Sequence, residues 1–492
     1  MHFLNRRRLL QSFGAATALS FCRADSQEVE IATPLGRLQG WQQNGVKVFR
    51  GIPFAQPPLE KLRFRPPIPC QPWAGVRQSF MSPAPIQTGE AKTSEDCLYL
   101  NVFAPAESGP HPVFVWIYGG GNIGGSANHP MLDGSNFARD GVVCVVINYR
   151  VGALGFLELN GLLEGFGQSG NLAIHDQLAA LGWVKQFIDV FGGNPQRITI
   201  GGESAGAKNV AAVMASRGAR GLFQRAISES GSAQTVHSMA QARDVTSLFL
   251  HESGLKAEQL PTLPSEVILE AQRKLLSAYP RNYPFRPVVD GRLIADVPLH
   301  SIAKESLPDI NMLLGTNRDE SSLFVDPEQA TGPLNQKELG NAPLQKLSPI
   351  EKAYEQAFPN VSTPDRHIRM LTAEEYWIPT VRIAEARASQ QSQTFLYRFD
   401  HTPTSGRFAH KAAHASELAF VWDHAAPETQ VLATAIHAAW VSFIKTGHPS
   451  ASGLPDWPAF RLPGRLTMLL NDRPSIESDP NGEERRIWTD RL

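Results

Sequence analysis

The segment Gly202-Glu203-Ser204-Ala205-Gly206 sets a serine between two glycines in the pattern G-x-S-x-G. Apolar, β-branched residues precede it at 198–200 and an alanine-rich stretch follows at 207–216, so we expect a buried strand, a sharp turn and a helix. Such a turn requires glycine on both sides and aims the serine hydroxyl off the end of a sheet, at the positive end of the helix dipole. The pattern predicts a nucleophilic serine at position 204; the alternative is an ordinary serine in a glycine-rich turn.

A second glycine run follows the apolar stretch 113–117. Gly119, Gly120 and Gly121 have no side chains, so a reacting oxygen can approach their backbone N–H groups closely. Together with the N–H of Ala205, they are expected to form an oxyanion hole. The alternative is a flexible loop after a strand.

A serine hydroxyl needs a base, and the base needs an acid that orients it. When a G-x-S-x-G turn ends a strand, the acid and then the histidine are expected on loops after later strands. Glu320 follows the strand-like segment 310–315, with Asp319 as its rival. His414 lies beyond the strand-like segment 394–399, and it has three rivals: His401, His410 and His424. Position alone leaves both choices open.

Strand and helix patterns alternate along the chain and predict a large α/β domain with a doubly wound, mostly parallel sheet. Further buried strands are expected at 142–148 and 223–228, and a helix at 172–191. Residues 28–50 alternate with glycine interruptions, which predicts antiparallel strands at a sheet edge. Amphipathic helices are expected within 240–280 and 345–390, and a late helix at 433–445 precedes His448, which we interpret as structural.

Composition excludes some partners. The chain of 492 residues has a formal net charge of −1 with interspersed charges, so it has no basic stripe for nucleic acid. It has no clustered metal-ligand spacing and no phosphate-binding loop, so we expect no metal and no cofactor.

Residues 1–24 are expected to be a signal peptide. Arg6, Arg7 and Arg8 precede Leu9, Leu10 and a short apolar run, which resembles a twin-arginine export signal and is too short to span a bilayer. Cleavage after Ala24 is expected, and a lipid anchor on Cys22 is disfavoured by the bulky Phe21. The precursor would use the twin-arginine machinery, and the mature chain, 25–492, would be periplasmic or secreted. The alternative is a basic N-terminal helix.

Three cysteines lie outside that segment. Cys144 belongs to an apolar run and is expected to be a small buried hydrophobe. Cys70 and Cys97 could pair in an oxidising compartment, and the spacing leaves this open.

Over most of its length the chain resembles the type-B carboxylesterases, the family of cholinesterases and bacterial para-nitrobenzyl esterases. The matching stretches, in order, are 49–55, 95–102, 119–121, 148–152, 191–195, 202–206 and 221–228. The resemblance implies an α/β-hydrolase fold, with a large, mostly parallel central sheet flanked by helices and antiparallel N-terminal edge strands. It also implies a catalytic triad of Ser204, Glu320 and His414, with Glu320 in a motif like G-x-N-x-D-E and His414 in one like H-x-x-E-L. The oxyanion donors would be Gly120, Gly121 and Ala205.

Three positions depart from the family pattern. Asn122 stands where an aromatic or bulky residue is common, which is expected to alter the polarity of the pocket. The usual disulfide partner of Cys97 would lie near Pro85, where no cysteine occurs, so Cys97 is expected to be free. Lys208 replaces a small or neutral residue, and we expect a snorkelled surface cation, with a role in binding anionic substrates as the alternative.

The resulting hypothesis is an exported bacterial serine hydrolase that cleaves small-molecule carboxylic esters with water through an acyl-enzyme. A lactonase, thioesterase or amidase would use the same residues. A non-catalytic, cholinesterase-like adhesion protein is a further alternative, disfavoured because all three triad residues are present.

Overall fold

A computed structural model describes residues 26–304, 309–328, 330, 332–334, 336–489 and 491. The predicted signal peptide, 1–24, lies outside the described residues.

Thirteen strands of the described chain form one sheet, in the order β1-β2-β3-β5-β7-β6-β8-β9-β12-β13-β14-β15, with β4 beside β2. Neighbours from β7 to β14 pair in parallel, whereas β1, β2, β3, β5 and β7 pair antiparallel, as do β14 and β15. The predicted fold class, a mostly parallel sheet with antiparallel N-terminal strands, is confirmed. The strands are β1 (Gln27–Thr33), β2 (Gly36–Gln43), β3 (Val46–Pro53), β4 (Val76–Gln78), β5 (Tyr99–Pro105), β6 (His111–Ile117), β7 (Val143–Ile147), β8 (Gly193–Glu203), β9 (Arg225–Glu229), β12 (Asn311–Asn317), β13 (Thr394–Phe399), β14 (Leu466–Leu470) and β15 (Ser475–Ser478). A separate parallel pair joins β10 (His237–Ser238) to β11 (Val288–Val289).

The burial of the strands follows their sequences. Every residue of β7 is buried, as expected for a continuous apolar run in a sheet covered on both faces, and Cys144 lies within it. At the N-terminal edge, β1 instead alternates between exposed and partly buried positions. Strands β14 and β15 were not predicted, because such short segments carry little periodicity.

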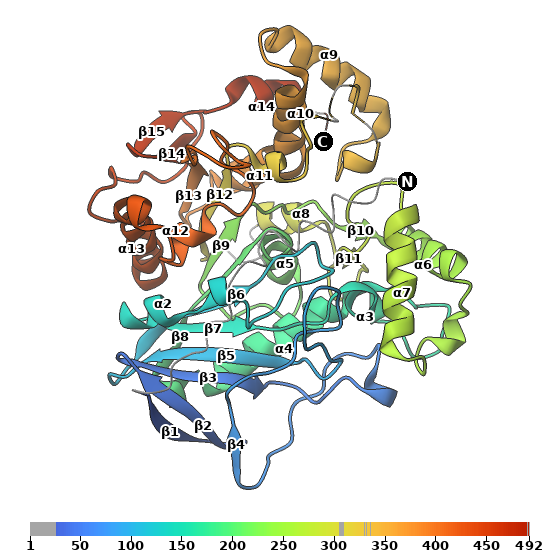
Figure 1. Ribbon diagram of the computed structural model, residues 1–492, viewed down its shortest axis with the longest axis vertical. Coiled ribbons are helices and arrows are strands. Elements are labelled where there is room, and N and C mark those ends of the chain that lie inside the picture. The colour runs from blue at the N-terminus through green and yellow to red at the C-terminus, as the bar shows by residue number, and fades with distance from the viewer. Residues whose placement is uncertain are drawn as a thin grey trace.

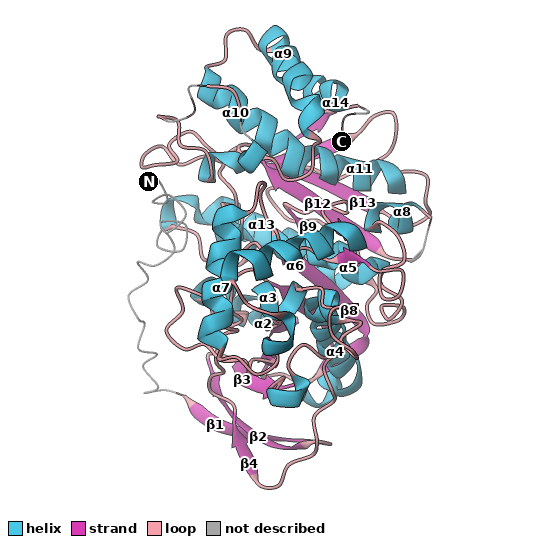
Figure 2. Cartoon of the chain, turned by 90° about the vertical axis from the view of Figure 1, so that its right-hand side faces the viewer, coloured by secondary structure: helices cyan, strands magenta, loops and turns pink. Residues whose placement is uncertain are grey.

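Helices lie on both sides of the central strands (Figure 1). In that view α2, α12 and α13 lie to the left of the strands, and α3, α5 and α8 lie to the right. Helices α9, α10 and α14 gather at one end of the molecule, opposite β1, β2 and β4 (Figure 2). The helices are α2 (Ser135–Arg139), α3 (Gly152–Phe156), α4 (Leu172–Phe187), α5 (Ala205–Ala215), α6 (Met239–Ser253), α7 (Ser265–Ala278), α8 (Pro298–Ala303), α9 (Leu347–Ala357), α10 (Thr363–Thr372), α11 (Ile378–Arg387), α12 (Leu418–Val421), α13 (Gln430–Thr446) and α14 (Gly482–Trp488).

The helices predicted at 172–191, 207–216, 240–280, 345–390 and 433–445 are all present, with boundaries that differ by a few residues. In the described part of the chain, no helix combines the length and the apolar character needed to cross a bilayer.

The sheet brings distant loops to one edge. Strands β6, β8, β9, β12 and β13 are parallel, so their carboxyl ends meet on the same side. Their register pairs Ile117 with Gly202, Glu203 with Glu229, and Asn317 with Phe399. The loops that follow these residues therefore lie side by side.

Candidate active site

Ser204 occupies a strained turn between β8 and α5. Its backbone has φ 55° and ψ −123°, a conformation that L-residues rarely adopt and that is typical of functional turns. A Cβ on Gly202 would lie 2.6 Å from the carbonyl carbon of Gly206 and 2.7 Å from the carbonyl oxygen of Ile117, so glycine is required there. The N–H of Ser204 donates to the carbonyl of Glu229 at 2.9 Å, which fixes the turn to the end of β9.

The glycine loop after β6 faces this turn. A Cβ on Gly119 would lie 3.0 Å from Cβ of Ser204. Gly120 and Gly121 both have positive φ, of 109° and 63°. Within the described chain their N–H groups donate to no other residue. As the first residue of α5, Ala205 has an N–H without an intrahelical acceptor. These amides are available to an approaching oxygen.

Glu320 lies just beyond β12 and is fully buried. Its Oε1 accepts hydrogen bonds from Ser230 Oγ at 2.5 Å and from the backbone N–H of Asn317 at 2.7 Å. These donors fix the orientation of the carboxyl group. Its other oxygen, Oε2, lies 2.5 Å from Nδ1 of His414.

His414 is held against the Ser204 turn by its neighbours. Its N–H donates to the carbonyl of Glu320 at 3.2 Å, and its ring packs against Tyr376 and Phe324 with centroid distances of 4.8 Å and 5.3 Å. Nε2, on the far side of the ring from Glu320, lies 3.0 Å from Oε1 of Glu203, the residue that precedes Ser204. This contact meets the distance of an ion pair, but among the described residues Glu203 Oε1 has no hydrogen-bond partner.

The predicted residues are therefore brought into one cluster, although no hydrogen bond joins Ser204 Oγ to His414 among the described residues. The rivals have other partners. Asp319 Oδ2 accepts hydrogen bonds from Arg318 Nε at 2.9 Å and from the N–H of Ala412 at 3.0 Å, so it faces away from His414. Of the rival histidines, His401 pairs with Asp472 at 2.6 Å. In the described structure neither His410 nor His424 forms a hydrogen bond or ion pair with Glu320.

Three further buried glutamates surround the cluster, and sequence reasoning assigned them no role. Burial raises the pKa of Glu203 well above its usual range, and the charge of Glu320 adds to this effect, whereas Lys208 opposes it. Burial likewise raises the pKa of Glu417 well above its usual range and that of Glu229 to about 8. Burial thus disfavours the charged form of all three, and the neutral form of Glu229 is favoured at pH 7. Glu203 lies within the G-x-S-x-G motif and Glu417 within the H-x-x-E-L motif, so the sequence already placed both near the proposed triad.

The structure corrects the interpretation of Lys208. This side chain is not a surface cation: it is only 8% exposed, and its Nζ forms an ion pair with Glu375. The surface prediction was wrong because the partner, Glu375, is 167 positions away in the sequence, where no local pattern could reveal it.

Asn122 is a polar residue whose side chain links two segments by hydrogen bonds. It is buried, with Nδ2 donating to the carbonyl of Phe285 at 3.1 Å and Oδ1 accepting from Asn209 Nδ2 at 3.0 Å. It joins the glycine loop to α5.

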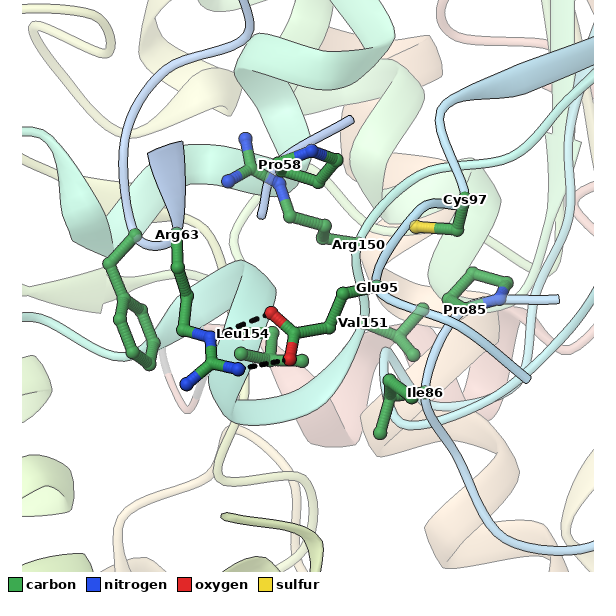
Figure 3. A pocket seen from close by; sticks show the side chains of 10 residues that line it. Pro58, Arg63, Pro85, Ile86, Glu95, Cys97, Arg150, Val151 and Leu154 are labelled. Carbon is green, nitrogen blue, oxygen red and sulfur yellow. Dashed lines mark hydrogen bonds and ion pairs between the residues drawn. The ribbon is translucent and has the colours of Figure 1, made fainter. Parts of the chain in front are cut away.

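Cys70, Cys97 and Cys144 are free. Cys97 and Pro85 line the same small pocket beside the Arg63–Glu95 ion pair, as Figure 3 shows. The expectation of a free Cys97 agrees with this arrangement. The residues that line this pocket do not include Ser204, Glu320 or His414.

Comparisons with known proteins agree on the family to which this chain is similar. Residues 26–488 match the model of the carboxylesterase family. The para-nitrobenzyl esterase of Bacillus subtilis (strain 168) is 36% identical over 487 residues, covering 93% of this chain and 97% of that protein. The fumonisin B1 esterase of Sphingopyxis macrogoltabida is 31% identical over 486 residues, covering 92% and 88%.

Solved structures show the same similarity. A PNB esterase superposes with a TM-score of 0.84 at 35% identity, covering 94% of this chain and all of that one. The Geobacillus stearothermophilus carboxylesterase EST55 superposes with a TM-score of 0.82 at 35% identity, covering 93% and 99%. The sequence match, the shared fold and the clustered loops lead to one conclusion: this chain belongs to the carboxylesterase family and is a carboxylic ester hydrolase.

Proposed function

We propose that the protein hydrolyses small-molecule carboxylic esters through an acyl-enzyme on Ser204, with His414 as base and Glu320 as the acid that orients it. The ester carbonyl oxygen binds the amides of Gly120, Gly121 and Ala205. His414 Nε2 takes the proton from Ser204 Oγ as it attacks the carbonyl carbon, and then gives that proton to the departing alcohol. Water, deprotonated by the same nitrogen, hydrolyses the acyl-enzyme and releases the acid.

The observation that carries this proposal is the placement of His414. Its Nδ1 lies 2.5 Å from Glu320 Oε2, so the opposite nitrogen faces the turn that holds Ser204. An imidazole that becomes protonated there is stabilised by Glu320. Burial raises the pKa of Glu203, which favours its neutral form relative to an exposed carboxyl group.

The test uses p-nitrophenyl and p-nitrobenzyl esters, the latter chosen from the name of the Bacillus relative. Ser204→Ala should lower kcat by about 10⁴-fold or more while leaving the unfolding midpoint unchanged. Ser277→Ala, on the outer helix α7, serves as the matched control and should keep full activity. An undiminished rate for Ser204→Ala would exclude Ser204 as the nucleophile.

We further propose that residues 1–24 direct export by the twin-arginine route and that the mature chain is periplasmic or secreted. The support is the run Arg6-Arg7-Arg8-Leu9-Leu10 ahead of a short apolar stretch. In a bacterial host, replacing Arg7 and Arg8 with lysine should leave the full-length precursor in the cytoplasm. Unchanged export of the doubly substituted chain would reject the route.

A further inference from the structure

A buried cation lies one helical turn beyond the proposed nucleophile. Lys208 is on α5, and its N–H donates to the carbonyl of Ser204 at 3.0 Å. Ser204 is the residue immediately before α5, so this hydrogen bond places Lys208 in the first turn of the helix that begins at the proposed nucleophile. The lysine side chain is 8% exposed, too little for a cation that merely reaches solvent.

The hydrogen-bonding capacity of this ammonium is only partly used. A lysine has three N–H donors and no acceptor. In the described structure one carboxylate oxygen, from Glu375, accepts from Nζ. The rings of Tyr283 and Tyr376 lie with their centroids 5.2 Å from Nζ, and aromatic faces attract a cation but are weaker partners than an oxygen. The ammonium can therefore still donate to an oxygen brought by a substrate.

Both aromatic rings border the reaction site. The Tyr283 ring lies against the glycine loop, since a Cβ on Gly121 would be 3.5 Å from its nearest ring carbons. The Tyr376 ring packs on His414 at 4.8 Å. Lys208 Nζ thus lies between the proposed oxyanion loop and the proposed base, beside the place where an ester must bind.

The groups around Lys208 are firmly anchored. Glu375 also accepts a hydrogen bond from Asn341 Nδ2 at 3.0 Å, and it lies in a π-helical turn, Ala373–Trp377, which carries Tyr376 as well. Pro379 follows this turn and has no N–H, which favours such an irregularity in the helix. Tyr283, with φ 55°, is held through its carbonyl by Nε of Arg286 at 2.9 Å.

Stability alone does not account for an ion pair at this depth. Removing two charges from water is costly, and replacing such a pair with apolar residues of similar size is often neutral or stabilising. We therefore look for a function of the Lys208–Glu375 pair, which lies close to the proposed reacting groups.

We propose that Lys208 makes the acyl pocket selective for esters whose acyl chain ends in a carboxylate, that is, monoesters of dicarboxylic acids. This inference rests on the proposed function. His414 has to face the departing alcohol to protonate it, so the acyl chain lies on the other side of the carbonyl, toward Gly121 and Tyr283. The distal carboxylate accepts a charge-assisted hydrogen bond from Lys208 Nζ while Glu375 keeps its own.

The experiment compares p-nitrophenyl monoesters of succinate, glutarate and adipate with p-nitrophenyl alkanoates of equal length. The measured quantity is the ratio of kcat/KM for each charged and uncharged pair. Lys208→Met should lower this ratio at least tenfold, with alkanoate rates changed less than threefold. Lys208→Arg should retain it, and Glu375→Gln should raise it by removing the competing negative charge. Lys352→Met, on the exposed face of α9, should behave as wild type.

An unchanged ratio in Lys208→Met, or an equal loss on both members of each pair, would overturn the proposal. It would equally be overturned if only esters with a carboxylated leaving group, such as 4-acetoxybenzoate against phenyl acetate, responded. If Lys208→Met fails to fold, the arginine and Glu375→Gln variants carry the test. Failure of the proposed function is separate, because Ser204→Ala would then keep its activity on all esters.

Discussion

Glu229 ends β9 opposite Glu203, the residue before Ser204, and is fully buried. Its Oε1 accepts a hydrogen bond from Trp440 Nε1 at 2.7 Å, while its backbone carbonyl holds the N–H of Ser204. Burial raises its pKa from the ordinary 4.5 to about 8. Glu229→Gln keeps the shape of the neutral acid and leaves the oxygen that Trp440 needs, so the variant is expected to fold.

The sign of the effect follows from proton linkage. Between pH 4.5 and pH 8 the unfolded chain has released a proton that the folded protein retains, so the wild-type free energy of unfolding falls as pH rises through this window. Glutamine lacks this proton. The stability of Glu229→Gln relative to wild type should therefore grow by about 3 kcal/mol from pH 5 to pH 8.

The assay is equilibrium urea unfolding, followed by tryptophan fluorescence at pH 5, 6, 7 and 8. Glu355→Gln provides the matched control, because this glutamate is exposed on α9 and its substitution should give a nearly constant difference from wild type. A difference for Glu229→Gln that is also constant across these pH values, or that shrinks as pH rises, would refute the reasoning that Glu229 is buried as a neutral acid.

Two further predictions concern the turn and the thiols. Gly202→Ala should lower activity at least 100-fold and destabilise the fold by about 1–3 kcal/mol, because the new methyl group would overlap Gly206 and Ile117. The measured quantities are kcat and the thermal midpoint. Gly218→Ala is the control, because its Cβ would meet only Leu178, at 3.7 Å. A fully active, equally stable Gly202→Ala would contradict the steric argument. Burial raises the pKa of Cys70 to about 11 and those of Cys97 and Cys144 well above their usual range. In a chain of residues 25–492, which lacks Cys22, iodoacetamide at pH 8 should therefore label the native protein slowly and label all three thiols after unfolding. Intact-mass measurement reads the labelling, and an unfolded chain with only one reactive thiol would reveal a disulfide.

The central parallel strands, with β14 as the exception, and the nucleophile turn were predictable because their signals are local. β6 and β7 contain continuous apolar runs, at 113–117 and 143–147, and the turn at Ser204 is specified by its own glycines together with the strand and helix beside them. The choice between Asp319 and Glu320 needed the family resemblance. Both residues carry a carboxyl group, and the sequence alone does not show which of two adjacent side chains in a loop points toward the histidine. The structure shows why they differ: Asp319 is occupied by Arg318 and the N–H of Ala412.

The surroundings of the site were not predictable, because their partners are far apart in the chain. Lys208 meets Glu375 across 167 positions, so no local pattern could show that it is buried. Glu229 and Trp440 are 211 positions apart. The raised pKa values arise from the same long-range packing, since burial is their largest cause.

The π-helical turn at Ala373–Trp377 has a consequence for how this pocket can diversify. Each residue of a regular helix rotates the chain by about 100°, so deleting Trp377, the last residue of this turn, would rotate the side chains upstream of it by that angle about the axis. Glu375 would leave Lys208 and Tyr376 would leave His414 in the same event. A single codon lost here would thus change the surroundings of Lys208 and His414 together, without altering any of the three residues proposed to perform the hydrolysis.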